Sequence, residues 1–203
     1  MDLINKIKNV LINPFKFFEN LKKEKGIRDA FIYLVILSLF AAVFGTVVGY
    51  FFQEFSLGMV SKVLGLTLPK PEYSFGYLFF WALIGYAIGL VMSFVWAGLL
   101  HAWILIFGGK GNYTKTYQLS VYYRTPRFVF GWIPVVSSLV WIYNLILLII
   151  GTEKVHDISR LRAILMYLIP VGVLILFVIL ILVFMVVVFA SYPGILKDAL
   201  VAP

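Results

Sequence analysis

The side chains best suited to bind an anion are two arginines, Arg124 and Arg127, which lie in the segment Tyr123-Arg124-Thr125-Pro126-Arg127. A guanidinium group can hold a phosphate through two parallel hydrogen bonds. His101 and Asn144 are polar residues within long apolar tracts. A charged or polar side chain at bilayer depth needs a partner. We therefore expect a lipid- or anion-binding site formed by Arg124, Arg127, His101, Tyr123 and Asn144.

Each of these residues also has a purely structural interpretation. Both arginines can extend from a helix end to the cytoplasmic interface. His101 can be a hydrogen-bonded packing residue, and Asn144 can join two helices. No predicted span contains Asp or Glu. The partners left for the arginines are backbone carbonyls, tyrosine hydroxyls, water or a lipid phosphate.

No group of residues predicts catalysis. Cysteine is absent, which excludes thiol nucleophiles, thiolate metal sites and disulfides. The histidines, His101 and His156, lie in different segments, and the glycine-rich run 108–112 lacks the spacing of a phosphate loop. We predict no enzymatic activity, no metal and no cofactor.

Long tracts without charge must position these residues. Four such tracts cover residues 30–53, 73–109, 128–152 and 163–196. Each exceeds the ~20 residues that a helix needs to cross a bilayer. With 63% hydrophobic and 13% charged residues, the chain lacks the polar surface of a soluble protein. The sequence predicts an all-α integral membrane protein, and its net charge of +8 reflects membrane topology and not nucleic-acid binding.

Residues 1–28 form a basic amphipathic segment. Apolar residues recur at helical spacing before Asn13-Pro14, which resembles a helix start. Phe17, Phe18 and Leu21 follow, interleaved with lysines. Such a segment suits the headgroup plane of an anionic leaflet, and a packing role beneath the helix bundle is the alternative.

Residues 29–203 form the predicted transmembrane domain. Its expected spans are 30–52, 75–107, 116–133, 135–151 and 161–191, with an interfacial loop at 54–73. In this five-span arrangement a hairpin turns near Trp132-Ile133-Pro134. The alternative is one helix from Thr125 through Pro134 to Ile150, which gives four spans.

Loop charge discriminates between the two arrangements. Of the 17 Lys and Arg residues, five spans place twelve on the cytoplasmic side and three outside, whereas four spans place ten and five. Positive residues concentrate in cytoplasmic loops. We therefore expect five spans in the cell membrane, with the N-terminus in the cytoplasm and the C-terminus outside.

Small residues repeat every fourth position in the first two spans. The repeats are Ala41, Gly45 and Gly49 in the first, and Gly85, Gly89, Ser93 and Ala97 in the second. Close backbone approach through small residues drives helix association in lipid. We predict that these two spans touch; a homodimer face on either helix is the rival interpretation.

These features together resemble the Yip family of Ypt/Rab-interacting membrane proteins, in its short prokaryotic form. The resemblance rests on the Pro14, Phe17-Phe18 and Leu21 segment before the first span, on Tyr123-Arg124-Thr125-Pro126, and on the five hydrophobic segments. It implies a five-helix membrane domain and, in eukaryotic members, vesicle traffic and binding of lipidated Rab GTPases.

Two departures from the eukaryotic pattern argue against a Rab partner here: no long polar region and no Asp-Leu-Tyr-Gly-Pro-like motif precede the first span. We expect a non-enzymatic scaffold that interacts with anionic membrane lipids or with other membrane proteins. The alternative is a small transporter or channel with a positively charged cavity formed by His101, Arg124, Arg127 and Asn144.

Overall fold

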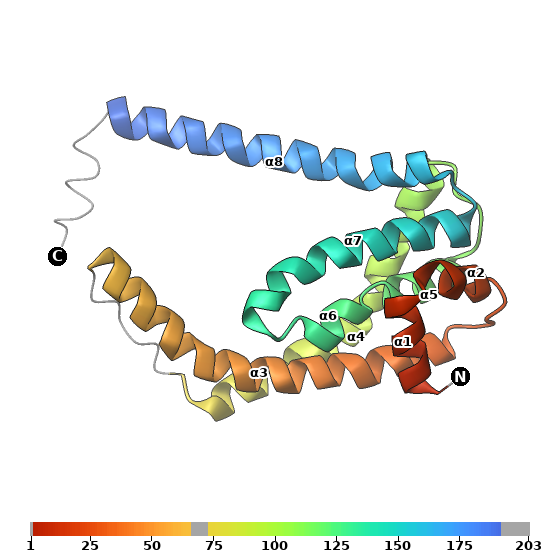
Figure 1. Cartoon of the computed structure of the whole chain (residues 1–203), viewed down its shortest axis with the longest axis horizontal. Coiled ribbons are helices and arrows are strands. Elements are labelled where there is room, and N and C mark those ends of the chain that lie inside the picture. The colour runs from red at the N-terminus through yellow and green to blue at the C-terminus, as the bar shows by residue number, and fades with distance from the viewer. Residues whose placement is uncertain (1, 66–72, 192–203) are drawn as a thin grey trace. The chain divides into compact units, whose positions relative to one another are not determined.

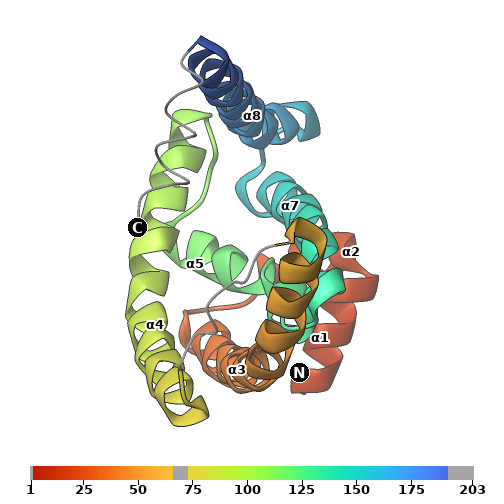
Figure 2. The ribbon, with the colours of Figure 1, turned by 90° about the vertical axis from the view of Figure 1, so that its left-hand side faces the viewer.

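The structure, a computed structural model, describes residues 2–65 and 73–191 (Figures 1 and 2). Every regular element in these ranges is a helix, which confirms the all-α prediction. The helices are α1 (Leu3–Ile12), α2 (Pro14–Leu21), α3 (Arg28–Leu64), α4 (Phe75–Ile106), α5 (Tyr113–Tyr122), α6 (Thr125–Phe130), α7 (Pro134–His156) and α8 (Arg160–Ser191). Residues up to 163 form one compact unit; the rest of α8 belongs to a second unit.

Four helices of the described ranges are long and apolar enough to cross a membrane. They are Arg28–Val63, Phe75–Ile106, Pro134–His156 and Arg160–Val188. Helices α4 and α8 begin and end within one residue of the predicted ranges 75–107 and 161–191. A hydrophobic tract by itself predicts a spanning helix, because lipid offers no hydrogen-bond partners and each backbone amide and carbonyl must be paired within the segment.

The predicted interfacial loop at 54–73 is wrong over its first part. Helix α3 continues past Gln53 to Leu64 and ends at Gly65, whose φ of 65° is left-handed. Glycine adopts this conformation without steric cost and ends a helix there. Gly58 lies inside α3 and does not end it. An isolated glycine destabilises a helix by only about 1 kcal/mol. The later loop residues 66–72 lie outside the described residues.

The predicted helix 116–133 is broken into α5 and α6. Pro126 has no amide hydrogen to donate to the carbonyl four residues earlier, so α5 cannot continue through it, and Pro126 instead occupies the first turn of α6. The alternative single helix through Pro134 is wrong, because α6 ends at Phe130 and α7 begins at Pro134. The turn between them lies where the hairpin interpretation placed it.

Helix α5 lies at the centre of the first unit. Its seven residues from Thr116 to Tyr122 are all buried, although three of them, Thr116, Gln118 and Ser120, are polar. Figure 2 shows α5 between α4 on one side and α3 and α7 on the other, and it packs against all three. The amide hydrogen of Lys110 donates to the carbonyl of His156 over 2.8 Å. The end of α7 therefore lies beside the loop that precedes α5.

Helices α3 and α4 pack together as predicted, but not through their glycines. The Tyr86 hydroxyl donates to the Val35 carbonyl over 3.3 Å. A Cβ atom added at Gly49, Gly85 or Gly89 would meet nothing within 4 Å, and at Gly45 it would meet Trp132 of the α6–α7 turn. Aromatic side chains instead fill the contact. The homodimer interpretation of these glycines stays a prediction.

The N-terminal segment forms two helices that meet at Asn13-Pro14, as the sequence indicated. Pro14 occupies the first turn, whereas the Asn13 side chain makes no capping hydrogen bond. Phe17, Phe18 and Leu21 are buried, and α2 packs along α7. This arrangement supports the packing interpretation of the segment. Ile4, Ile12 and Phe15 remain exposed.

Candidate functional site

The five residues predicted to bind a lipid or anion do not form one site. In the described residues, Arg127 and Asn144 line one cavity of about 220 Å³ between α6 and α7, and the other three residues are not part of its lining. Its other lining residues are Gly131, Ser137, Val140 and Trp141. We call it the Arg127 cavity.

Asn144 is the most informative residue of the Arg127 cavity. Its side chain is 9% exposed, and its Oδ1 atom is buried without a hydrogen-bond partner. A buried acceptor left unpaired costs about 1–3 kcal/mol. The predicted role of Asn144 in joining two helices gains no support from this oxygen, since it has no partner. Arg127 is exposed and can direct its guanidinium donors toward a ligand in the cavity.

Arg124 lies outside the Arg127 cavity. Its Nε atom donates to the hydroxyl of Tyr123 over 3.1 Å, and its guanidinium carbon is 5.4 Å from the centre of the same ring. A tyrosine hydroxyl was one of the predicted partners for the arginines. The two arginines therefore have different surroundings.

The two histidines meet, which the sequence did not indicate. His101 Nδ1 is 2.7 Å from Thr116 Oγ1, and Thr116 Oγ1 is 3.2 Å from His156 Nε2. His156 Nδ1 is 2.9 Å from the carbonyl oxygen of Lys110. Thr116 and His156 are fully buried. This chain of hydrogen bonds joins α4, α5 and α7, as expected of a packing role for His101.

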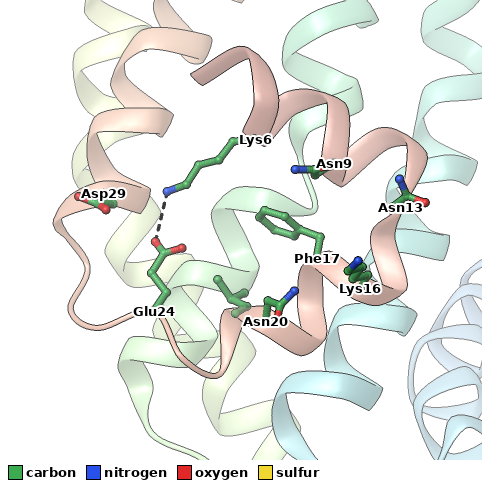
Figure 3. Close-up of a pocket in the computed structure, with 9 residues that line it drawn as sticks. Lys6, Asn9, Asn13, Lys16, Phe17, Asn20, Glu24 and Asp29 are labelled. Atoms are coloured by element: carbon green, nitrogen blue, oxygen red, sulfur yellow. Dashed lines mark ion pairs between the residues drawn. The ribbon is translucent and has the colours of Figure 1, made fainter. Parts of the chain in front are cut away.

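The sequence did not indicate a further cavity, which is larger than the Arg127 cavity. It measures about 410 Å³ and lies between α1, α2 and the start of α3 (Figure 3). We call it the N-terminal pocket. Seven of its nine lining residues are polar or charged; the nine are Lys6, Asn9, Asn13, Lys16, Phe17, Asn20, Leu21, Glu24 and Asp29.

A buried ion pair closes one side of the N-terminal pocket. Lys6 Nζ lies 3.5 Å from Glu24 Oε1 and donates to the Tyr122 hydroxyl over 2.9 Å. The same hydroxyl donates to Glu24 Oε1 over 2.7 Å. The side chains of Lys6 and Glu24 are only 11% and 21% exposed. Both contacts use one oxygen of Glu24, so its Oε2 atom stays available to a ligand.

The connector between α2 and α3 is fixed against α5. Lys115 Nζ donates to the carbonyls of Leu21 and Glu24, and Gln118 Nε2 donates to the carbonyl of Gly26 over 2.6 Å. These bonds hold Glu24 in position at the pocket.

One sequence signal could have indicated the N-terminal pocket. Lys6, Asn9 and Asn13 recur at positions i, i+3 and i+7, which places them on one helical side. The sequence analysis used the apolar residues and lysines of this segment to predict an interfacial or packing role, and it did not predict a polar pocket beside α1. The decisive partner, Tyr122, is 116 residues away from Lys6.

A family model described as the Yip1 domain matches residues 8–194. The chain belongs to the Yip family. Neither a curated protein nor a solved structure matches it. With its long apolar helices, this Yip-family chain is a multi-pass membrane protein. The Yip family is known as a family of non-enzymatic membrane proteins, and the described residues hold no group of three or more His, Asp or Glu side chains placed to bind a metal.

The two segments that carry the Yip resemblance both contact Tyr122, the residue just before the second segment. The ring of Phe17 contacts the ring of Tyr122 at a centroid distance of 5.1 Å. Thr125, in the second segment, lies 2.9 Å from the hydroxyl of Tyr33, whose ring also contacts Tyr122. Phe17 of the first segment and Thr125 of the second therefore lie in one cluster with Tyr122 and Tyr33, which joins α2, α3, α5 and α6.

Proposed function

We propose that this Yip-family protein is a non-enzymatic membrane scaffold that binds the headgroups of anionic phospholipids. The observation that carries the proposal is the pairing of Arg127 with Asn144 in one cavity, where the Asn144 Oδ1 atom is buried and unpartnered. Arg127 supplies donors for a phosphate. Asn144 Oδ1 would accept from a headgroup hydroxyl, so a phosphoglycerol headgroup matches both residues.

We also propose five membrane crossings, with the N-terminus in the cytoplasm and the C-terminus outside. The hydrogen bond between Lys110 and His156 supports this arrangement, because it brings the loop after α4 and the end of α7 to one end of the unit. The chain from Lys110 to His156 must therefore leave this end of the unit and come back to it. Helices α5 and α6 would together form the third crossing, and α7 the fourth.

Cysteine labelling tests this topology directly, because the chain contains no natural cysteine. We expect Lys110→Cys to react with a membrane-impermeant maleimide only after the cytoplasmic face is opened. Val135→Cys, at an 80% exposed position beside the α6–α7 turn, and Ala202→Cys, outside the described residues, should react from the outer face. Labelling of position 135 from the cytoplasmic face would instead identify α6 and α7 as a hairpin that re-enters the membrane.

The transporter alternative has less support. It needs one positively charged cavity that contains His101, Arg124, Arg127 and Asn144. In the described residues Arg127 and Asn144 line a cavity together, while His101 and Arg124 bond to Thr116 and Tyr123. We therefore keep lipids as the proposed ligands. Other membrane proteins or a second copy of the chain are the proposed protein partners, and we do not propose a Rab-type GTPase.

Lipid binding by an Arg127 variant tests the proposed function. Arg127→Gln should weaken phosphatidylglycerol binding in nanodiscs by about tenfold, as expected for loss of one charge-assisted contact of roughly 1.5 kcal/mol. Arg124→Gln is the matched control, because Arg124 contacts Tyr123 and lies outside the cavity lining. Equal binding by the native protein and Arg127→Gln would refute the proposal.

A further inference from the structure

The N-terminal pocket carries charges of both signs. Lys6 and Lys16 are balanced by Glu24 and Asp29, and three asparagine amides complete the polar lining. Figure 3 shows the carboxylates on one side and Lys16 with the amides of Asn13 and Asn20 on the other. A purely anionic headgroup would face two carboxylates here. A headgroup that itself carries both charges matches the pocket.

Two of these charges are unused by the fold. Lys16 and Asp29 are exposed, and neither has an ion-pair or hydrogen-bond partner for its side chain in the described part of the chain. Lys6 and Glu24, in contrast, are paired with each other and with Tyr122. The free pair can therefore engage a ligand without breaking an internal bond.

An apolar groove begins where the N-terminal pocket ends. A second cavity, of about 240 Å³, shares Lys6 and Asp29 with the pocket and continues along Leu3, Ile32, Tyr33 and Ile36. Asp29, Ile32, Tyr33 and Ile36 follow one face of α3 at helical spacing. Ile32 and Ile36 are 45% and 43% exposed. The groove thus follows a helix long and apolar enough to cross the membrane, as an acyl chain would.

We infer that the N-terminal pocket binds an aminophospholipid, a phosphodiester headgroup that carries a primary ammonium. Lys6 lies at the junction of pocket and groove, and the ammonium N–H that neither Glu24 nor Tyr122 uses would donate to the phosphate. Asp29 and the Oε2 atom of Glu24 would accept from the ammonium. The acyl chain would lie along Ile32 and Ile36. This inference rests on the proposed headgroup-binding function and adds a second site with its own lipid class.

The chemistry of the lining discriminates against other headgroups. Recognition of a trimethylated ammonium relies on several aromatic faces, and Phe17 is the one aromatic residue among those that line the pocket. Phosphatidylcholine also has no N–H group to donate to the carboxylates. Phosphatidylglycerol has no positive charge for Asp29. Phosphatidylethanolamine and phosphatidylserine share the required chemistry, and the serine carboxylate would additionally reach Lys16 and the asparagine amides.

Native mass spectrometry of the full-length protein tests this inference. It would be performed in the Arg127→Gln background, so that the Arg127 cavity contributes little, with four lipids of identical acyl chains. We expect phosphatidylethanolamine and phosphatidylserine to bind about tenfold more tightly than phosphatidylglycerol or phosphatidylcholine, because one ammonium–carboxylate contact is worth roughly 1.5 kcal/mol. Equal binding of all four lipids, or preference for phosphatidylglycerol, would overturn the inference.

Substitutions at the two free charges localise the effect. Asp29→Asn should remove the preference for both amine-bearing lipids, whereas Lys16→Gln should weaken phosphatidylserine alone. Glu19→Gln in α2 and Lys8→Gln in α1 are controls with the same chemical changes, because both residues are exposed and neither is in the pocket lining. They should leave binding unchanged. An amine preference that survives Asp29→Asn in a folded protein would contradict the assignment.

A competition experiment separates a lipid from a soluble ligand. Soluble phosphoethanolamine should fail to displace phosphatidylethanolamine at matched concentration, because it lacks the chain that occupies the groove. Displacement would overturn the lipid assignment. The two proposals also fail separately. Loss of the preference for amine-bearing lipids would refute the aminophospholipid site and would not bear on the Arg127 cavity. Unchanged phosphatidylglycerol binding by Arg127→Gln would refute the proposed function and would not bear on amine selectivity.

Discussion

Replacing Glu24 by glutamine should destabilise the first unit by about 1–3 kcal/mol, the cost of leaving a buried ammonium without its counter-charge. Glutamine keeps the shape of the side chain and can still accept a hydrogen bond. The substitution therefore removes only the negative charge beside Lys6, whose side chain is 11% exposed. Unfolding in mixed detergent micelles, followed by circular dichroism, measures the change.

A double-mutant cycle distinguishes this charge effect from general damage. Lys6→Met should also destabilise the protein, and the double variant Lys6→Met, Glu24→Gln should be more stable than the sum of the single effects indicates. Glu19→Gln is the matched control, because Glu19 is exposed on α2. Strict additivity would show that Lys6 and Glu24 do not interact energetically.

Alanine at Gly151 should destabilise the protein by about 1–3 kcal/mol, the usual cost of overpacking a core. Gly151 lies in α7, where alanine would ordinarily favour the helix. An added Cβ atom would overlap Leu119 of α5 and approach Phe18 of α2 to 3.1 Å. Both neighbours are fully buried, so neither can move without disturbing the core.

The matched control for Gly151→Ala is Gly58→Ala in α3. A Cβ atom at Gly58 would meet nothing within 4 Å. This substitution should stabilise its helix by up to about 1 kcal/mol, because alanine has the higher helix propensity. The same chemical change thus has opposite signs at two helical positions. Thermal unfolding of both variants in detergent checks the prediction, and a stable Gly151→Ala variant would contradict the described contact between α2, α5 and α7.

Sequence analysis predicted the elements whose cause is local. The spans predicted within the charge-free tracts, 75–107 and 161–191, match α4 and α8 to within one residue, because a spanning helix must satisfy its own backbone in lipid. Proline supplied the other boundaries: α2 begins at Pro14 and α7 at Pro134. Where the loop residues were apolar and no proline intervened, as at 54–64, the sequence analysis ended α3 too early.

The candidate sites depended instead on contacts between distant segments. Arg127 and Asn144 were both predicted, and they do share a cavity, but nothing in their spacing separates them from Arg124 and His101. His101 and His156 both bond to Thr116, from which they are 15 and 40 residues away in the chain, respectively. Such pairings follow from how α4, α5 and α7 pack.

By itself, the sequence determined that this chain is a helical membrane protein of the Yip type, because hydrophobic length and composition act on each segment separately. The tertiary structure alone decided which polar groups remain free. It paired Lys6 with Glu24 and Tyr122, left Lys16 and Asp29 without partners in residues 2–65 and 73–191, and buried Asn144 Oδ1 beside Arg127. Whether a polar side chain is used by the fold or available to a ligand depends on its neighbours in space, and these come from segments far apart in the chain.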